Sequence, residues 1–247
     1  VSSEKNEPIH TWSIGMPKSP DLYHASIVSK HLNSYHHCIE LKEEDFINAL
    51  PEVIQTIESY DVTTVRASVG NWLIGKHIKQ MSEQKVIFNG DGADEVCGGY
   101  LYLKNAPNDI DFEKDCRRLL NEIHLFDVLR CDRSISSHGL EPRTPFLDKA
   151  FVQTYFSIPV VYRRSSDKLE KKLLRDAFEG MLPDSVLYRK KEAFSDGVSS
   201  NENSWFSILQ KHIKNTYDMT EPEYYKKIFE ETYKNQSHVI PHLWMPK

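Results

Sequence analysis

Three carboxylates stand close together in a glycine-rich stretch near the middle of the chain. Asp91, Asp94 and Glu95 are interspersed with Gly90 and Gly92. Glycine lets a ligand approach the backbone closely, which favours a nucleotide or phosphate site. Carboxylates suit such a site if a divalent cation bridges them to phosphate, or if one of them does proton or positioning work. The alternative is an acidic cluster that the dipole of a following helix favours without any ligand; the residues favour the site but leave both interpretations open.

The elements around this stretch indicate an α/β protein. Residues 86–88 form a short apolar run that predicts a buried parallel strand leading into the glycines. Residues 11–14 and 35–39 are two further strand candidates, and Ser19-Pro20-Asp21 between them is typical of a helix start. A strand–helix–strand opening is the repeating unit of a parallel sheet.

The spacing of apolar residues in the rest of the chain predicts mostly helices. Residues 43–60 have helical spacing, but Pro51 is expected to split or bend that helix. Asp61 or a threonine is expected to cap the next helix. Further helices are predicted over residues 108–137 and 168–181, and two more follow Trp205.

One charged helical residue and one charged loop are candidate sites. Arg66 lies in the first turn of its helix, the wrong end for the helix dipole, which favours a specific task such as binding an anion. Residues 139–148 form a loop that Pro142 and Pro145 are expected to make rigid, and it carries several fixed charges. The basic segment 188–198, by contrast, is by itself typical of solvated lysines.

Composition excludes several classes of protein. The chain has 247 residues and a net charge of −5, so no basic field argues for nucleic acid. No apolar run approaches the length of a membrane span. The four cysteines form no C-x-x-C pair, which predicts reduced thiols in a cytoplasmic protein. His36 and His37 are adjacent in a predicted strand and point to opposite faces, so a structural role is favoured over metal binding.

Taken together, these stretches resemble the synthetase domain of the asparagine synthetase family, in the family's own order and across most of the chain. The matching segments are residues 14–17, 19–22, 60–64, 66–68, 89–95, 98–102, 139–141, 143, 145–148, 191–192 and 194–198. The resemblance implies a Rossmann-like parallel sheet with helices on both faces, of the ATP-pyrophosphatase type, and a helix-rich C-terminal half. It implies that residues 1–247 form one synthetase-like domain.

The activity implied is a ligase reaction: ATP-dependent amidation of aspartate to asparagine through β-aspartyl-AMP, with Mg²⁺. The nitrogen would be ammonia, normally released from glutamine by a glutaminase domain. A cytoplasmic protein with no nucleic-acid or membrane partner is expected, and the resemblance leaves room for a homodimer.

The resemblance also assigns nucleotide-binding residues. Ile14 would lie by the adenine through its backbone, and the backbone of Asn89 and Gly90 would approach the nucleotide. Asp94 would help to bind Mg²⁺, and Lys191 would stabilise phosphate charge.

A second set of residues is implied to act on the aspartate. Arg66, Thr63 and Thr64 would lie near the aspartate or the transition state. Asp91 stands where the family has a glutamate tied to the acyl-adenylate. Glu141 and Arg143 would be scaffold residues at the pocket edge.

The sequence departs from the family pattern in two ways. The family motif usually reads Ser-Gly-Glu-Gly-Ser-Asp-Glu, and here Asn89, Asp91 and Ala93 replace the first serine, the first glutamate and the second serine. The family's pyrophosphate loop, Ser-Gly-Gly-x-Asp-Ser, is expected upstream of Thr11 and is not found, and the glutaminase domain is missing too.

These departures keep alternatives open. A fragment of a longer polypeptide is the first expectation. A catalytically weak or inactive relative that serves as a binding or structural protein is the second. Another acyl-adenylating enzyme, such as a β-lactam synthetase, is the third.

Overall fold

The computed structural model describes residues 8–164, 169–192, 197–200 and 202–240, which form two compact units. Unit 1 comprises Val1–Lys85, Arg130–Leu140 and Glu192–Lys247, and unit 2 comprises Val86–Leu129 and Glu141–Lys191. Each unit contains one pair of parallel strands with helices around it, so the chain is α/β with parallel strands, as predicted. Whether residues 1–247 act as one synthetase domain stays a prediction.

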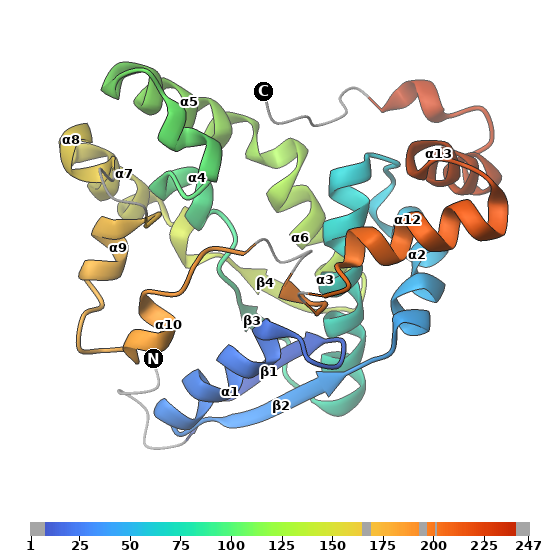
Figure 1. The fold of residues 1–247 in the computed structure, drawn as a ribbon, viewed down its shortest axis with the longest axis horizontal. Helices are drawn as coiled ribbons and strands as arrows, with labels where there is room; N and C mark the ends of the chain where they lie inside the picture. The colour runs from blue at the N-terminus through green and yellow to red at the C-terminus, as the bar shows by residue number, and fades with distance from the viewer. Residues whose placement is uncertain (1–7, 165–168, 193–196, 201, 241–247) are drawn as a thin grey trace. The chain divides into compact units, whose positions relative to one another are not determined.

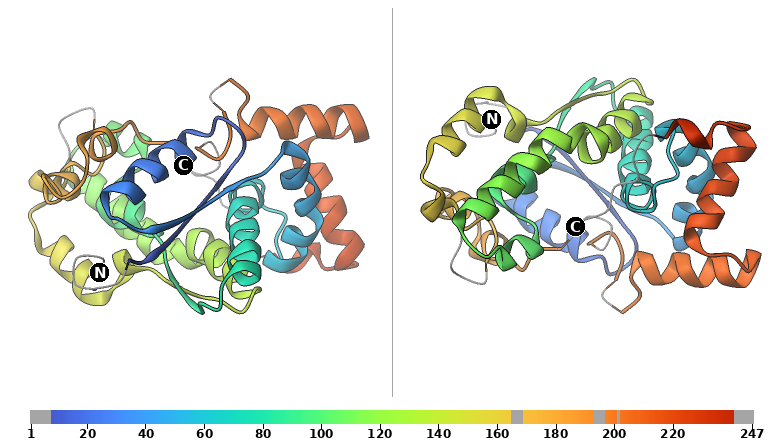
Figure 2. Two further views of the ribbon diagram at one scale, coloured as in Figure 1. Left: turned by 90° about the horizontal axis from the view of Figure 1, so that it is seen from below. Right: turned by 90° about the horizontal axis from the view of Figure 1, so that it is seen from above.

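Unit 1 opens with the predicted strand–helix–strand. Strand β1 (His10–Gly15) pairs in parallel with β2 (Tyr35–Glu40), with His10 opposite Tyr35 and Gly15 opposite Glu40. Helix α1 (Pro20–His31) lies along the pair (Figures 1 and 2). The Ser19 side chain accepts the Leu22 N–H at 3.2 Å and so caps the helix, which confirms the predicted helix start.

The core of unit 1 is built by long helices. Helices α2 (Glu43–Ile57) and α3 (Val62–Met81) pack together, and α13 (Glu221–Thr232) lies against both (Figure 1). Helix α12 (Trp205–Tyr217) packs on α13. Of the two outcomes expected at Pro51, a split is wrong, because α2 is one helix with the proline inside it, and a bend stays a prediction. Its fully buried residues hold the helix together through packing, which outweighs the lost backbone hydrogen bond; they are Phe46, Leu50, Val53, Ile54 and Ile57.

Unit 2 is made of short elements around β3 (Val86–Phe88) and β4 (Glu141–Arg143). These two strands are parallel, with Val86 opposite Glu141 and Phe88 opposite Arg143. The other elements, in chain order, are α4 (Ala93–Cys97), η2 (Leu101–Asn105), α5 (Asp109–Glu122), η3 (Ile123–Leu125), η4 (Pro145–Leu147), α7 (Lys149–Ser157), α8 (Val160–Arg163), α9 (Lys172–Asp176) and α10 (Asp184–Leu187). Helix α6 (Asp127–Ser136) begins in unit 2 and continues into unit 1, and η5 (Ser237–Val239) is the last element among the described residues.

Three predictions for unit 2 need correction. β3 is parallel as expected but not buried: Val86 is 45% exposed and Phe88 67%, because within the described residues β3 has only β4 as a neighbour. The loop expected over 139–148 contains strand β4, whose pairing with β3 no local signal reveals. Of the helix expected over 168–181, the described residues 169–181 keep only α9, which begins after Lys171 because the left-handed backbone of that residue (φ 55°, ψ 34°) cannot belong to a right-handed helix.

Two predictions from composition can be compared with the structure. All four cysteines are free thiols, three of them buried. Within the described residues, no helix is both long and apolar enough to cross a membrane.

Candidate active site

The carboxylate of Asp94 lies between two lysines in unit 2. Its Oδ1 is 2.5 Å from Lys171 Nζ, and its Oδ2 is 3.0 Å from Lys191 Nζ. All three side chains are largely buried, since Asp94 is 25%, Lys171 20% and Lys191 13% exposed. The sequence predicted Asp94 and Lys191 for one site, and the structure brings them together although they are far apart in the chain.

Two glycines make room for this arrangement. Gly92 has a φ of +85°, and a Cβ there would lie 2.4 Å from Leu147. Gly99 lies against the ion pair, because a Cβ there would come within 1.9 Å of Asp94 Oδ1. The Gly92 N–H donates to Asp127 Oδ2 at 3.1 Å, which fixes the turn before α4. The glycines therefore allow a tight turn at one position and a close approach to a carboxylate at the other.

The carboxylates of this site have different electrostatic surroundings. Burial alone would raise the pKa of Asp94, but Lys171 and Lys191 outweigh it and the pKa is lowered. Glu95 is almost fully buried, and that burial, with Asp127 nearby, raises its pKa to about 7. Tyr100 donates its hydroxyl to Glu95 at 2.5 Å, and its ring lies 5.7 Å from Lys191 Nζ. Asp94 is thus a fixed negative charge, whereas Glu95 changes its protonation state around neutral pH.

The loop before α4 carries the other predicted nucleotide-binding residues. The Asn89 N–H donates to the carbonyl of Arg143 at 3.1 Å, which continues the pairing of β3 with β4. The Asp91 N–H donates to the Asn89 side-chain oxygen at 3.3 Å. Gly90 is exposed, with no heavy atom within 4 Å of an added Cβ, so its backbone is open to a ligand.

Glu141 and Arg143 lie on β4, one on each side of Pro142. Their side chains form an ion pair of 2.7 Å with each other and are 59% and 58% exposed. They carry charge at the surface beside the Asn89 loop, and their expected place at a pocket edge stays a prediction.

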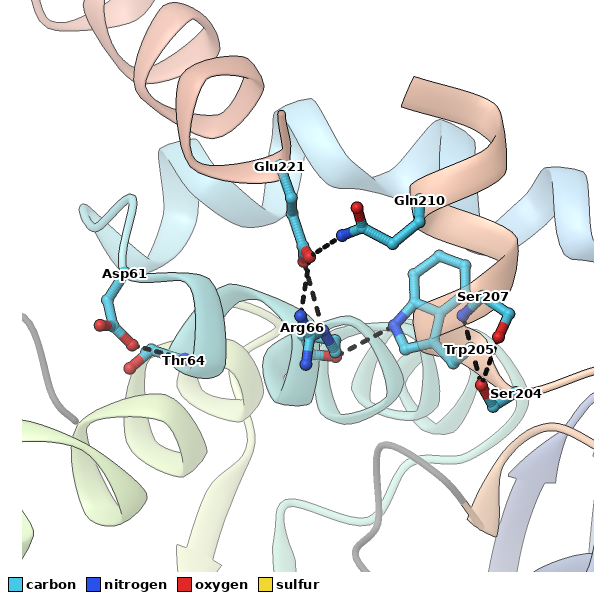
Figure 3. A network of polar contacts seen from close by, with 8 residues as sticks. All are labelled: Asp61, Thr64, Arg66, Ser204, Trp205, Ser207, Gln210 and Glu221. Carbon is cyan, nitrogen blue, oxygen red and sulfur yellow. Dashed lines mark hydrogen bonds and ion pairs between the residues drawn. The ribbon is translucent and has the colours of Figure 1, made fainter. Parts of the chain in front are cut away.

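In unit 1, Arg66 is held by a buried carboxylate (Figure 3). Its Nη2 lies 2.7 Å from Glu221 Oε2 and its Nε 3.2 Å from Oε1, a two-pronged geometry that fixes the guanidinium. Glu221 is 2% exposed and also accepts a hydrogen bond from Gln210 at 2.6 Å. The Phe206 ring lies 4.8 Å from the guanidinium carbon. The anion that Arg66 contacts in this structure is therefore Glu221.

The threonines of the same helix differ in exposure. Asp61 Oδ1 accepts the Thr64 N–H at 2.7 Å, so Asp61 is the cap, one of the two predicted alternatives (Figure 3). Thr64 is buried, whereas Thr63 is exposed and its side chain is accessible to a substrate.

The turn after β1 meets the end of the basic segment within unit 1. Ser19 Oγ donates to the carbonyl of Gly197 at 2.6 Å, and the Met16 N–H donates to the carbonyl of Val198 at 2.6 Å. Ile14 lies two residues before this turn, and its side chain is buried in the core. Its backbone is therefore the part of the residue suited to contact a ligand. Two segments of the family pattern, 14–22 and 197–198, are thereby brought side by side, while residues 194–196 lie outside the described residues.

Sequence reasoning missed Lys171 and Asp127. Lys171 lies in the segment predicted as a helix over 168–181, and nothing in its local sequence pairs it with Asp94. Asp127 lies in the segment predicted to be helical over 108–137, where charged residues are usually solvated, yet it is 5% exposed and accepts the Gly92 N–H. Only burial and long-range pairing distinguish such residues from solvated ones.

Metal binding by the described residues alone is not indicated. No group of three or more His, Cys, Asp and Glu residues within the described ranges is arranged to hold an ion. His36 bonds to Thr11 and Ser13, and His37 bonds to His10 at 2.9 Å and stacks on Trp12 at 3.9 Å. The adjacent histidines thus have separate partners, in agreement with the predicted structural role.

Comparison with known proteins identifies the family. The family model described as asparagine synthase matches residues 1–116 and 104–245. The proteins named asparagine synthetase [glutamine-hydrolyzing] from Gallus gallus, Bos taurus and Homo sapiens are each 44% identical to this chain over 259 residues. That match covers 97% of this chain and 46% of each relative, so the chain spans about half the length of these relatives. The chain belongs to the asparagine synthase family.

Proposed function

We propose that this chain provides the synthetase part of an ATP-dependent ligase that amidates aspartate to asparagine. The observation that carries the proposal is the Asp94 carboxylate between Lys171 and Lys191, directly after the open glycine loop. The finer fold proposed is the Rossmann-like sheet of ATP pyrophosphatases, which the parallel strand pairs support.

The chemistry explains why such a site is needed. The β-carboxylate of aspartate is a poor electrophile, because attack builds charge on a group that is already anionic. Its oxygen attacks the α-phosphorus of ATP, the bond to pyrophosphate breaks, and β-aspartyl-AMP forms. Ammonia then attacks the acyl carbon, AMP departs with the bonding electron pair, and the nitrogen loses a proton. The first step needs alignment of two anions and neutralisation of the departing pyrophosphate.

The residues of unit 2 fit the first step. Lysine ammonium groups neutralise phosphate as compact point charges, and Lys191 is fixed by its contact with Asp94. The backbone of Asn89 and Gly90 would accommodate the nucleotide next to them. Asp91 would act at the acyl-adenylate.

The Asp94 carboxylate also fits a magnesium ion. Mg²⁺ is commonly held by one or two carboxylates together with substrate phosphates rather than by a cage of protein ligands. Asp94 remains ionised because two lysines lower its pKa. The ion, when bound, would supply positive charge to the phosphates, while Asp94 would hold it and the lysines would lie alongside.

The residues of unit 1 would serve the adenine and the aspartate. Ile14 would contact the base through its backbone, and Thr63 and Thr64 would lie near the aspartate with Arg66. Glu221 and Gln210 support that role by keeping the Arg66 guanidinium in one orientation. The nitrogen donor would be ammonia from a glutaminase domain, in keeping with the term glutamine-hydrolyzing in the names of the relatives. We also propose a cytoplasmic enzyme and a homodimer.

The alternatives are not favoured. The relatives compared above carry the name of asparagine synthetase, and none of those three is named a β-lactam synthetase or a binding protein.

The test is aspartate-dependent exchange of labelled pyrophosphate into ATP, measured on the full-length native polypeptide. We expect exchange with the wild type and a loss of about 100-fold or more in Lys191→Met, because phosphate charge is left uncompensated. Lys190→Met is the matched control, since Lys190 is the exposed neighbour, and it should keep full exchange. Wild-type protein without aspartate-dependent exchange would refute the proposal.

A further inference from the structure

We propose that Glu221 is a positioning residue for the amino-acid substrate. It holds the Arg66 guanidinium so that one defined edge of the group is left for a substrate carboxylate. This inference rests on the proposed function and deepens it. It adds a residue that lies outside every segment matching the family pattern described above.

The N–H donors of Arg66 are the first argument (Figure 3). A guanidinium carries five N–H groups. Glu221 accepts one from Nε at 3.2 Å and one from Nη2 at 2.7 Å, which occupies the edge between these two nitrogens. Two N–H groups on Nη1 and one on Nη2 are left, and they have no acceptor among the described residues. The edge between Nη1 and Nη2 is therefore the one that can receive a carboxylate from a ligand.

The burial of Glu221 is the second argument. Its side chain is 2% exposed, whereas that of Arg66 is 22% exposed, so the ion pair is open to solvent on the arginine side. Glu221 is the first residue of α13, where the helix dipole favours a carboxylate. Gln210 of α12 also donates to its Oε2 at 2.6 Å. Glu221 is thus fixed by contacts of its own and can hold Arg66 in place.

The remaining contacts of Arg66 are the third argument. The Phe206 ring lies 4.8 Å from the guanidinium carbon and covers one face of the group. Trp205 is fully buried, and its Nε1 donates to the carbonyl of Arg66 at 3.2 Å, which ties the backbone of α3 to α12 (Figure 3). Thr63 is exposed and lies three residues before Arg66, on the same side of α3. Its hydroxyl is therefore available to the ligand that Arg66 would bind.

The charge of Glu221 separates positioning from simple attraction. A carboxylate beside Arg66 weakens the attraction of the guanidinium for an anionic substrate, so Glu221 would hinder a residue that acted by charge alone. Its contribution is direction, because a guanidinium held at one edge cannot rotate away from the substrate.

Three roles of Glu221 therefore predict three results for Glu221→Gln, which removes the charge and keeps the size. If Glu221 positions Arg66, the KM for aspartate rises. If it only competes with aspartate for Arg66, that KM falls. If it only stabilises the fold, the melting temperature falls and the KM for aspartate stays unchanged.

The experiment measures asparagine formation by the full-length native polypeptide, with ammonium chloride as the nitrogen donor and a thermal melt of each variant. Aspartate and ATP are varied in turn. Glu221→Gln should raise the KM for aspartate about 10-fold and change the KM for ATP by less than about 2-fold, because the ATP phosphates are bound elsewhere. Glu221→Asp keeps the charge but is shorter, so it should restore only part of the loss.

Gln210→Leu provides a second test that leaves both charges in place. It removes the neutral hydrogen bond that orients Glu221, so we expect the KM for aspartate to rise about 3-fold. Gln210 is only partly buried, and this variant decides the matter if Glu221→Gln does not fold.

Glu230→Gln is the matched control, because it makes the same change on the same helix. Glu230 is 45% exposed, and its Oε1 lies 3.9 Å from Lys226 Nζ. Both KM values should equal those of the wild type. An unchanged or lower KM for aspartate in folded Glu221→Gln, or in Gln210→Leu if the former does not fold, would overturn the inference and leave the proposed function standing. Wild-type protein that neither forms asparagine nor exchanges pyrophosphate would overturn the proposed function itself.

Discussion

At the scale of single residues, Asp91 is the change with the clearest chemical consequence. It keeps the charge of the family glutamate but is one methylene shorter, and it follows a loop fixed by the Asn89 contacts. Misplacement of a reacting group by such a distance costs a large factor in rate. We therefore expect Asp91→Glu to raise the turnover number for asparagine formation several-fold, at saturating ATP and aspartate.

Asp176→Glu is the control for that measurement, because it makes the same change on exposed α9 and should leave turnover unaltered. An unchanged or lower turnover number in Asp91→Glu would show that this site has adapted to the shorter side chain.

His138 gives the folded state a dependence on pH. It lies against Trp72 in unit 1, with ring centroids 5.0 Å apart. Burial lowers its pKa below the ordinary 6.5; a hydrogen bond to the Trp72 backbone and the charge of Glu52 oppose this effect, and Lys76 adds to it. As pH falls below 6.5, the unfolded chain binds the proton before the folded chain does, so this residue reduces the free energy of unfolding. We expect the wild type to lose stability between pH 7.5 and pH 5.5 relative to His138→Gln, measured by urea unfolding at each pH.

The wild type must be compared with His138→Gln at each pH, because Glu95 changes the free energy of unfolding in the opposite direction. Its pKa is raised to about 7, so its protonation stabilises the folded state over the same range. That contribution is common to both proteins and cancels in the difference. A difference that stays constant with pH would show that His138 is not the group responsible.

At the scale of elements, the turn between β3 and α4 depends on one glycine. Gly92 has a positive φ and contacts Leu147, whereas Gly90 two residues earlier has neither constraint. Gly92→Ala should lower the free energy of unfolding by about 2 kcal/mol or more, through backbone strain and overpacking. Gly90→Ala should change it by less than about 1 kcal/mol, and equal effects in urea unfolding would contradict this account.

The first three elements show where local sequence patterns predict the structure correctly. β1, α1 and β2 follow the predicted bounds within about a residue, because alternation, a serine cap and a proline at the helix start are all local signals. The same reasoning fails at β4 and at α9. β4 exists through pairing with a distant strand, and α9 begins only after the left-handed backbone at Lys171. Neither cause is visible in neighbouring residues.

At the scale of the whole molecule, the two units offer separate spectroscopic signals. Trp12, Trp72 and Trp205 all lie in unit 1, and the residues of unit 2 include no tryptophan. Because each unit has its own buried cluster, we expect Gly92→Ala in unit 2 to lower the urea midpoint seen by far-ultraviolet circular dichroism more than the midpoint seen by tryptophan fluorescence. Equal shifts by both probes would mean that the units unfold as one.

The sequence by itself determined the parallel α/β class, the opening strand–helix–strand and the ordered motifs that place the chain in its family. These depend on interactions within a few residues, or on residue identity alone. Only the tertiary structure decided that Lys171 and Lys191 share Asp94, that Glu221 holds Arg66, and that Asp127 is buried behind the glycine turn. Each of these interactions joins residues far apart in the chain. The sequence identifies a charged residue but does not show whether water or another charged side chain surrounds it. Packing alone removes the water and selects the partner.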